Sequence, residues 1–266
     1  MENKIAQNIE SDAQKPEMVL NPEEAEVLHA MMEAGLFYGL NRSKTNPKMK
    51  PYLSSTKSGI EIINLIQTLK SLESASKVLK EKIKSGGLPL IVGTTPAVKA
   101  SVKELGTKFG VPFVIERWLG GTLTNFKTIT SRVQYLKKLR IDRESGKLEK
   151  YTKKEKLNFE REMGKLDRLF SGLGAMDKMP AVVIIFDLKN HEVAAKEARR
   201  MKVISIAVSN TNVDPETVDY PIISNDRNPK SIEFISSYLS KAIEEGKKEA
   251  VETVKTAEVK KENGKS

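Results

Sequence analysis

The sequence predicts an α/β protein with a flavodoxin-like, doubly wound parallel sheet and an inserted, coiled-coil-like antiparallel helical hairpin. Short apolar runs alternate with segments of helical spacing along most of the 266 residues. The runs AVVIIFD (181–187) and VISIAV (203–208) are apolar at consecutive positions, as in strands buried on both faces. Such strands, alternating with helices, indicate a parallel sheet covered by helices on both sides. The stretch between the third and fourth runs breaks this rhythm and predicts the hairpin.

The N-terminal region is polar up to residue 20, lacks apolar periodicity, and is expected to be flexible. Asn21 followed by Pro22 is typical of a helix start, and this helix should end near Gly35. The segment NRSKTNPKMKPYLSSTK (41–57) then predicts a basic loop, which its two prolines keep extended.

The α/β body is predicted from six apolar runs and the helical spacing between them. The predicted strands are 59–65, 88–92, 111–116, 181–187, 203–208 and 220–223. The predicted helices are 66–84, 96–109, 192–200 and 230–245. This alternation of apolar strands and helices favours one parallel sheet.

Residues 127–178 predict two antiparallel helices with basic outer faces and a narrow apolar seam. Two apolar stripes form the seam, and a break at Glu144-Ser145-Gly146 separates them. The stripes are Ile129, Val133 and Leu136, and Phe159, Met163, Leu166 and Phe170. The chain therefore divides into a flexible N-terminus (1–20), an α/β domain (21–126 and 179–245), the hairpin (127–178) and a polar tail (246–266). The tail is low in complexity, which predicts a disordered or partly helical segment.

The net charge of +10 is concentrated in two blocks. Residues 1–40 carry two lysines and eight acids, residues 41–57 carry five basic residues and no acid, and residues 127–178 carry fifteen basic and eight acidic residues. Two positive blocks fit a polyphosphate partner, because each neutralised phosphate releases condensed counterions. The alternative is ordinary solvated lysine on helix surfaces.

Composition also excludes several classes of protein. The chain has no cysteine, so disulfides, thiolate metal sites and a cysteine nucleophile are excluded. No apolar run approaches the length of about 20 residues that spans a bilayer, and the N-terminus has no secretory hydrophobic stretch. These features are typical of a cytoplasmic protein that does not act in a membrane.

Motifs for catalysis are missing from the sequence. The two histidines, His29 and His191, lie far apart without clustered ligands, so surface or packing roles are favoured over a metal site. The segment Gly93-Thr94-Thr95-Pro96 follows a strand and opens a helix, where free N–H groups attract anions. Ordinary helix capping by Thr95, with Pro96 at the first helical position, is the favoured alternative.

The segment RWLGGTLTNF (117–126) is more informative, because it follows a predicted strand at the edge where parallel sheets bind ligands. Arg117 could pair with phosphate, and the Gly120-Gly121 pair would admit a close backbone approach. Alternatively, Trp118 packs in the core and the glycines turn the chain into the hairpin. The residues alone leave both interpretations open.

Several blocks resemble one family, small-subunit ribosomal protein two, the universal uS-two family. RWLGGTLTNFKTI (117–129) resembles the signature of that family. Further blocks follow in the same order, over roughly residues 25–240. They are NPKMKPYL (46–53), SGIEIINLIQT (58–68), VGTTPAV (92–98), YTKKEKLNFEREMGKLDRLFSGLGAM (151–176) and NTNVDPETVDYPIISND (210–226).

The resemblance implies a structural constituent of the bacterial small ribosomal subunit, and not an enzyme. It implies binding to 16S rRNA between head and body, contact with neighbouring ribosomal proteins including the S-one protein, and a cytoplasmic, ribosomal location. It implies no cofactor, no metal, no membrane and no small-molecule substrate. Two departures are evident: Gly35–Leu40 lacks the two histidines usual in bacterial relatives, and Asn210 replaces the usual aspartate.

The candidate RNA-binding residues lie in three places. In the basic loop they are Arg42, Lys44, Lys48 and Lys50, and near the hairpin base they are Arg117, Trp118 and Asn125. On the hairpin they are Lys137, Lys138, Lys153 and Lys154. Phosphate contacts of this kind position a protein on folded RNA and carry little sequence information. The rival hypothesis is a flavodoxin-like enzyme or nucleotide binder that uses Gly93–Thr95 and the 117–125 loop. A role outside the ribosome, in RNA binding or adhesion, is a second rival that no residue supports.

Overall fold

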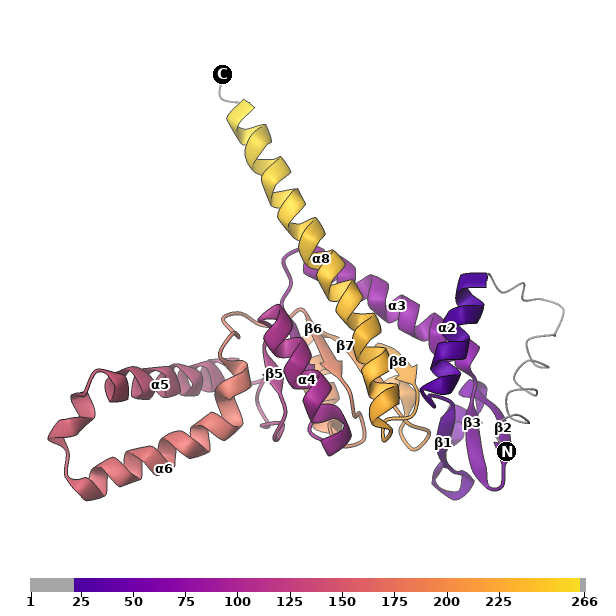
Figure 1. The fold of residues 1–266 in the computed structure, drawn as a ribbon, viewed down its shortest axis with the longest axis horizontal. Coiled ribbons are helices and arrows are strands. Elements are labelled where there is room, and N and C mark those ends of the chain that lie inside the picture. The colour runs from indigo at the N-terminus through magenta and orange to yellow at the C-terminus, as the bar shows by residue number, and fades with distance from the viewer. Residues whose placement is uncertain (1–21, 264–266) are drawn as a thin grey trace.

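The structure is a computed structural model, which describes the backbone of residues 22–263 and the side chains of residues 22 and 24–251. Over these residues the protein contains two separate sheets (Figure 1). The expected flexible N-terminus and the cap at Asn21 lie outside the described residues. One sheet is antiparallel, in the order β1-β3-β2, and consists of β1 (Tyr38–Asn41), β2 (Leu53–Lys57) and β3 (Ile60–Ile63). The other is parallel, in the order β5-β4-β6-β7-β8, and consists of β4 (Pro89–Val92), β5 (Phe113–Val114), β6 (Val182–Ile185), β7 (Ile204–Ser209) and β8 (Tyr220–Ile223).

The parallel sheet has the flavodoxin-like order. Numbered within the sheet, its strands run 2-1-3-4-5, and every neighbouring pair is parallel. The predicted α/β, doubly wound parallel fold is therefore confirmed. The order reverses between β4 and β6, and in such sheets the crevice at the carboxyl ends of these two strands is the usual ligand site.

Helices cover both faces of this sheet. Figure 1 shows α4 and α8 in front of the strands. The helices of this front layer and its edge are α2 (Pro22–Glu33), α3 (Leu65–Lys84), α4 (Pro96–Phe109) and α8 (Pro229–Asn263). The opposite face packs against α7 (Glu192–Met201) and the base of a helix pair formed by α5 (Phe126–Glu144) and α6 (Lys153–Phe170). The helix pair extends away from the sheet (Figure 1).

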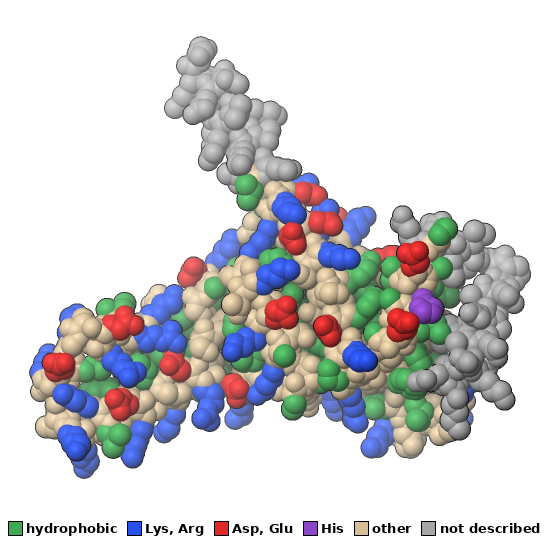
Figure 2. Space-filling model, viewed as in Figure 1, with side chains coloured by type: hydrophobic (Ala, Val, Ile, Leu, Met, Phe, Trp, Pro, Cys, Tyr) green, Lys and Arg blue, Asp and Glu red, His purple; other side chains and the backbone are tan. Residues whose placement is uncertain are grey.

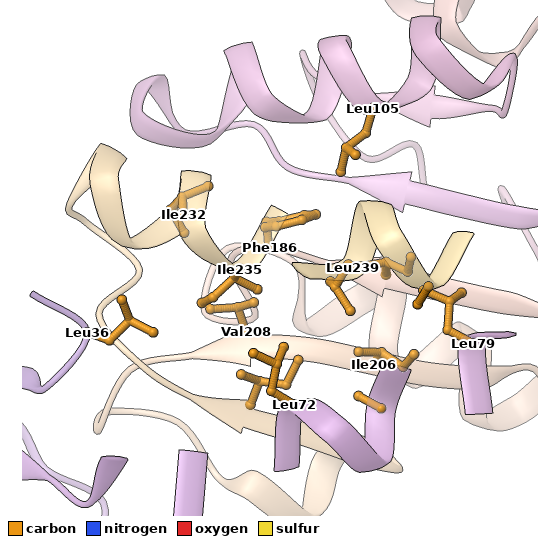
Figure 3. Packing of buried hydrophobic residues seen from close by; sticks show 14 of the residues in the cluster. Leu36, Leu72, Leu79, Leu105, Phe186, Ile206, Val208, Ile232, Ile235 and Leu239 are labelled. Carbon is orange, nitrogen blue, oxygen red and sulfur yellow. The ribbon is translucent and has the colours of Figure 1, made fainter. Parts of the chain in front are cut away.

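The larger core lies between the sheet and the α3, α4 and α8 layer. Alternate strand residues point toward it, among them Ile206 and Val208 of β7. Figure 3 shows Ile235 and Leu239 of α8 close to these side chains, and Leu72 of α3 belongs to the same cluster. Each fully buried aliphatic side chain contributes about 1.5–3 kcal/mol relative to an exposed one. This layer therefore supplies much of the stability.

The second core lies on the opposite face and continues into the helix pair. Val183 and Ile185 of β6 face this side, because side chains alternate along a strand. They share the cluster with Ile129 and Val133 of α5 and with Phe170 of α6. The base of the helix pair is thus packed onto the sheet.

Two expectations about the N-terminal half are wrong. The run 59–65 contains β3, which belongs to the antiparallel sheet and not to the parallel one. Its partners β1 and β2 are short and mostly polar, so their sequences gave no strand signal. The basic loop is also not extended, because residues 42–44 and 47–52 form 3-10 turns capped by the side chains of Asn41 and Asn46.

The expected end of the last helix near residue 245 is also wrong. The backbone of α8 continues to Asn263. Gly246 allows close packing on α3, where a Cβ would lie 2.9 Å from the carbonyl oxygen of Lys80. Glu245 and Glu249 then form ion pairs with Lys80 at 2.9 and 2.8 Å. These contacts explain why the helix passes the glycine.

Candidate nucleic-acid interface

The basic loop exposes all four of its predicted RNA-binding residues. Arg42 and Lys44 lie in the first 3-10 turn, and Lys48 and Lys50 lie in the second. The loop is held by Met49, which is fully buried against Ile63 and Ile223. A buried methionine thus fixes the turn that presents the two lysines beside it.

The same loop is bonded to the segment that follows β7. The backbone N–H of Asn46 donates a hydrogen bond to the Thr211 carbonyl oxygen at 2.8 Å. The Lys48 ammonium lies 2.8 Å from the Asp214 carboxylate and 2.5 Å from that of Glu216. The hydrogen bond from Lys48 lowers the pKa of the Asp214 carboxyl. Lys48 therefore has two protein partners, whereas the described residues offer none to the Lys50 side chain.

The loop that follows β5 is organised by one buried carboxylate, that of Glu197 on α7. It accepts hydrogen bonds from the backbone amides of Gly121 (2.8 Å), Leu123 (3.0 Å) and Thr124 (3.1 Å). It also accepts from the indole N–H of Trp118 at 3.2 Å and from the Thr124 hydroxyl at 3.2 Å. Although burial raises the pKa of the carboxyl, these donors outweigh that effect and the pKa is lowered. The loop thus surrounds an anion that α7 supplies.

This arrangement separates the three candidates near the hairpin base. Trp118 is buried, with 7% of its surface exposed, so the structure favours its alternative role in the core. Arg117 and Asn125 are exposed, and Asn125 accepts a hydrogen bond from the Thr128 hydroxyl at 2.8 Å. Glu197 was missed by the sequence analysis, although it stands among Ala194, Ala195 and Ala198 on the buried face of α7.

The helix pair exposes the remaining four candidates. Lys137 and Lys138 lie on α5, and Lys153 and Lys154 lie in the first turn of α6, and the side chains of all four are exposed. The start of α6 is fixed by Thr152, whose side chain and amide exchange hydrogen bonds with Glu155. Figure 2 shows Lys and Arg side chains spread over this arm and along the lower edge of the molecule. The arm therefore offers a positive surface of considerable length.

The crevice between β4 and β6 holds a cavity of about 360 Å³. Its lining includes Thr95, which starts α4, the acids Asp187 and Asp226, and the cations Lys189 and Arg227. Burial is the largest cause that raises the pKa of the Asp226 carboxyl, and the nearby Asp187 adds to it. Acids and cations are balanced around the cavity, so its lining lacks the positive excess of a phosphate site. Gly93 serves packing, because a Cβ there would lie 2.2 Å from Val98 Cγ1.

The histidines take the packing and surface roles that were favoured. His191 is buried, and its Nδ1 lies 2.8 Å from the Asp187 carbonyl oxygen. His29 is exposed, 3.7 Å from Glu33. Within the described part of the chain, no three His, Cys, Asp or Glu side chains lie close enough to hold a metal ion. Of the helices searched over the same residues, none is long and apolar enough to cross a bilayer.

Comparisons with known proteins give one consistent result. The model of the family described as ribosomal protein S2 matches residues 31–246. A small ribosomal subunit protein uS2 of Dictyoglomus thermophilum is 40% identical over 221 residues, which are 83% of this chain and 90% of the relative. Proteins of the same name from Coprothermobacter proteolyticus and Mycobacterium leprae are 38% and 40% identical, over 83% and 81% of this chain and 82% and 78% of their own lengths.

Proposed function

The chain belongs to the ribosomal protein S2 family, and from this premise we propose that it is a structural component of the small ribosomal subunit that binds 16S rRNA between head and body. The family consists of structural proteins and not of enzymes, so the rival hypothesis of a flavodoxin-like enzyme is set aside. The bacterial relatives are all small ribosomal subunit proteins uS2, which agrees with a bacterial ribosomal protein.

The observation that carries the RNA-binding proposal is the exposed positive charge on two separate surfaces. On the basic loop these are Arg42, Lys44 and Lys50, and on the helix pair they are Lys137, Lys138, Lys153 and Lys154. Capped turns and a capped helix present these side chains, so binding does not have to order the backbone. Lys48 contributes less, because two carboxylates already neutralise it.

Partners other than RNA follow from the same premise. Neighbouring small-subunit proteins and the S-one protein are the expected ones, and the long helix pair is the element that would extend between them. The cytoplasmic ribosome is the corresponding location. We also propose the division into an α/β domain and a hairpin, supported by the way α5 and α6 extend away from the sheet (Figure 1).

The test is rebinding of the full chain to small subunits depleted of it, followed by sedimentation over a series of salt concentrations. The double variant Lys44→Glu/Lys50→Glu should lower the slope of log affinity against log salt by about two units, one for each lost phosphate contact. The matched control is Lys77→Glu/Lys103→Glu, which changes the charge equally on exposed positions of α3 and α4. Equal occupancy of both variants at every salt concentration would refute the role of the basic loop.

Wild-type protein that fails to rebind at low salt would refute the function itself. A position away from the cleft between head and body, seen in the reconstituted subunit by electron microscopy, would refute the placement alone. Circular dichroism of each protein shows separately that it is folded, so neither outcome can be caused by misfolding.

A further inference from the structure

The outer face of α7 is a third positive surface. Residues 189–202 contain five basic and two acidic residues. Both acids are already used, because Glu197 is buried in the loop that follows β5 and Glu192 pairs with Lys189 at 2.9 Å. The charges that remain exposed, without a side-chain partner among the described residues, are Lys196, Arg200 and Lys202. Lys196 and Arg200 are four residues apart and so share one face of the helix.

Lys202 caps α7 in the left-handed backbone conformation, with φ +56° and ψ 32°. Its amide and that of Val203 donate to the carbonyl of Ala198, which closes the helix. Glycine is the usual residue at this position, because Cβ makes the conformation unfavourable. A lysine at this position adds a third exposed cation at the end of the helix that carries Lys196 and Arg200.

The α7 surface lies between the two basic surfaces already described. At its C-terminal end, Arg199 donates to the Glu216 carbonyl, and the carboxylate of Glu216 pairs with Lys48 of the basic loop. In the middle of the helix, Glu197 holds the loop that leads into α5. Consecutive hydrogen bonds therefore connect the basic loop, α7 and the base of the helix pair.

We propose that Lys196, Arg200 and Lys202 contact rRNA phosphates and join the other two surfaces into one continuous RNA-binding face. This proposal rests on the proposed function and names a part of the interface that neither basic block contains. RNA fits better than a protein partner, because protein interfaces are depleted of charge at their centre. Only Val193 and Met201 are exposed apolar side chains on this helix.

The first experiment measures rebinding of the full chain to small subunits depleted of it, by sedimentation over a series of salt concentrations. The variant Lys196→Glu/Arg200→Glu should lower the slope of log affinity against log salt by about two units relative to wild type. The control Lys77→Glu/Lys103→Glu has the same net charge but changes exposed lysines on α3 and α4, which cover the opposite face of the sheet. It should keep the wild-type slope.

The variant Lys202→Gly separates charge from structure. Glycine relieves the left-handed strain, so the melting temperature should stay equal or rise. The salt slope should nevertheless fall by about one unit. Weaker binding by a protein that is at least as stable has no explanation in folding, and this result would establish the contact.

The outcomes distinguish this inference from the function on which it rests. If wild-type protein does not rebind depleted subunits, the proposed function fails. If wild-type protein rebinds and the α7 variants keep its affinity and slope, only the α7 surface is refuted. If those variants rebind poorly but keep the wild-type salt slope, α7 contacts a neighbouring protein, and the RNA assignment is wrong.

Discussion

The loops that follow β4 and β5 leave the sheet at the same edge, but they satisfy their backbone amides in different ways. The loop after β5 surrounds the Glu197 carboxylate with three amides, an indole and a hydroxyl. The loop after β4 opens α4 beside a cavity, and the Thr95 hydroxyl there is buried with no hydrogen-bond partner among the described residues. One loop is closed by an internal anion, and the other is open beside two acids.

This difference shows that the sequence of a loop after a strand does not by itself make the loop a ligand site. Glycines and free amides at a strand end predict anion binding only while those amides lack an acceptor within the protein. Glu197 supplies that acceptor after β5. After β4 the start of α4 lies beside a cavity whose lining holds Asp187 and Asp226 together with Lys189 and Arg227. Neither loop therefore combines free amides with an excess of positive charge, although both follow strands of a fold that often binds a nucleotide.

Removal of the internal anion should have the largest effect. Glu197→Ala leaves several buried donors unsatisfied, and each of them should lower the free energy of unfolding by about 1–3 kcal/mol. Urea denaturation at pH 7 measures this loss. The control Glu192→Ala, which breaks only a surface ion pair, should cost less than about 1 kcal/mol. Equal midpoints for the two variants would contradict the anchoring role.

The pH dependence sharpens the same contrast. The pKa of Glu197 is lower in the folded protein than in the unfolded chain, so its contribution is complete above the unfolded value. The contribution should be lost as the pH falls through the folded value. The stability difference between wild type and Glu197→Ala should therefore shrink on acidification, which denaturation at a series of pH values will show.

The open loop should respond to a change in packing. Gly93→Ala places Cβ 2.2 Å from Val98 Cγ1 and 2.9 Å from Val102 Cγ2, and overpacking of this kind costs about 1–3 kcal/mol. Gly120→Ala in the other loop is the matched control, because no atom lies within 4 Å of its added Cβ. Thermal denaturation should show a lower midpoint only for Gly93→Ala. Unchanged midpoints for both would mean that α4 can move aside.

The acids of the cavity should give the smallest effect, with opposite sign. Burial raises the pKa of Asp226, so the charged form destabilises the fold as the pH rises through the folded value. Asp226→Asn should therefore be slightly more stable than wild type at pH 7. The difference should vanish below the pKa of the unfolded aspartate, where both proteins are neutral at this position. A less stable variant at pH 7 would show that the hydrogen bond with Asn210 matters more.

Much of the fold could be predicted from the sequence, because its strands are apolar enough to be recognised. The strands at 182–185, 204–209 and 220–223 and the helix at 96–109 lie at or within a residue or two of their expected positions. The antiparallel sheet could not be predicted, since β1 and β2 are polar and rely on pairing with β3. Local pattern carries no information about such pairing.

The sequence predicted which charged residues form the candidate site, but not which of them are already paired with other protein groups. All the basic residues proposed for RNA contact are exposed. Their ion pairs, such as that of Lys48 with Asp214, join segments far apart in the sequence and leave no local signal. Glu197 did leave one, because it shares a helix face with three buried alanines. An acid on an apolar face indicates a buried partner.

The packing of α8 on α3 has a consequence for how the chain acquires its structure during synthesis. The front core is completed by Ile232, Ile235 and Leu239, which are made long after Leu72 of α3. At translation rates of about 5–20 residues per second, α3 remains without its partner for roughly 10–30 s. Its apolar face is exposed to solvent and to other nascent chains in that time. The front core therefore forms only after α8 has been synthesised, and this makes chaperone binding most useful before α8 emerges.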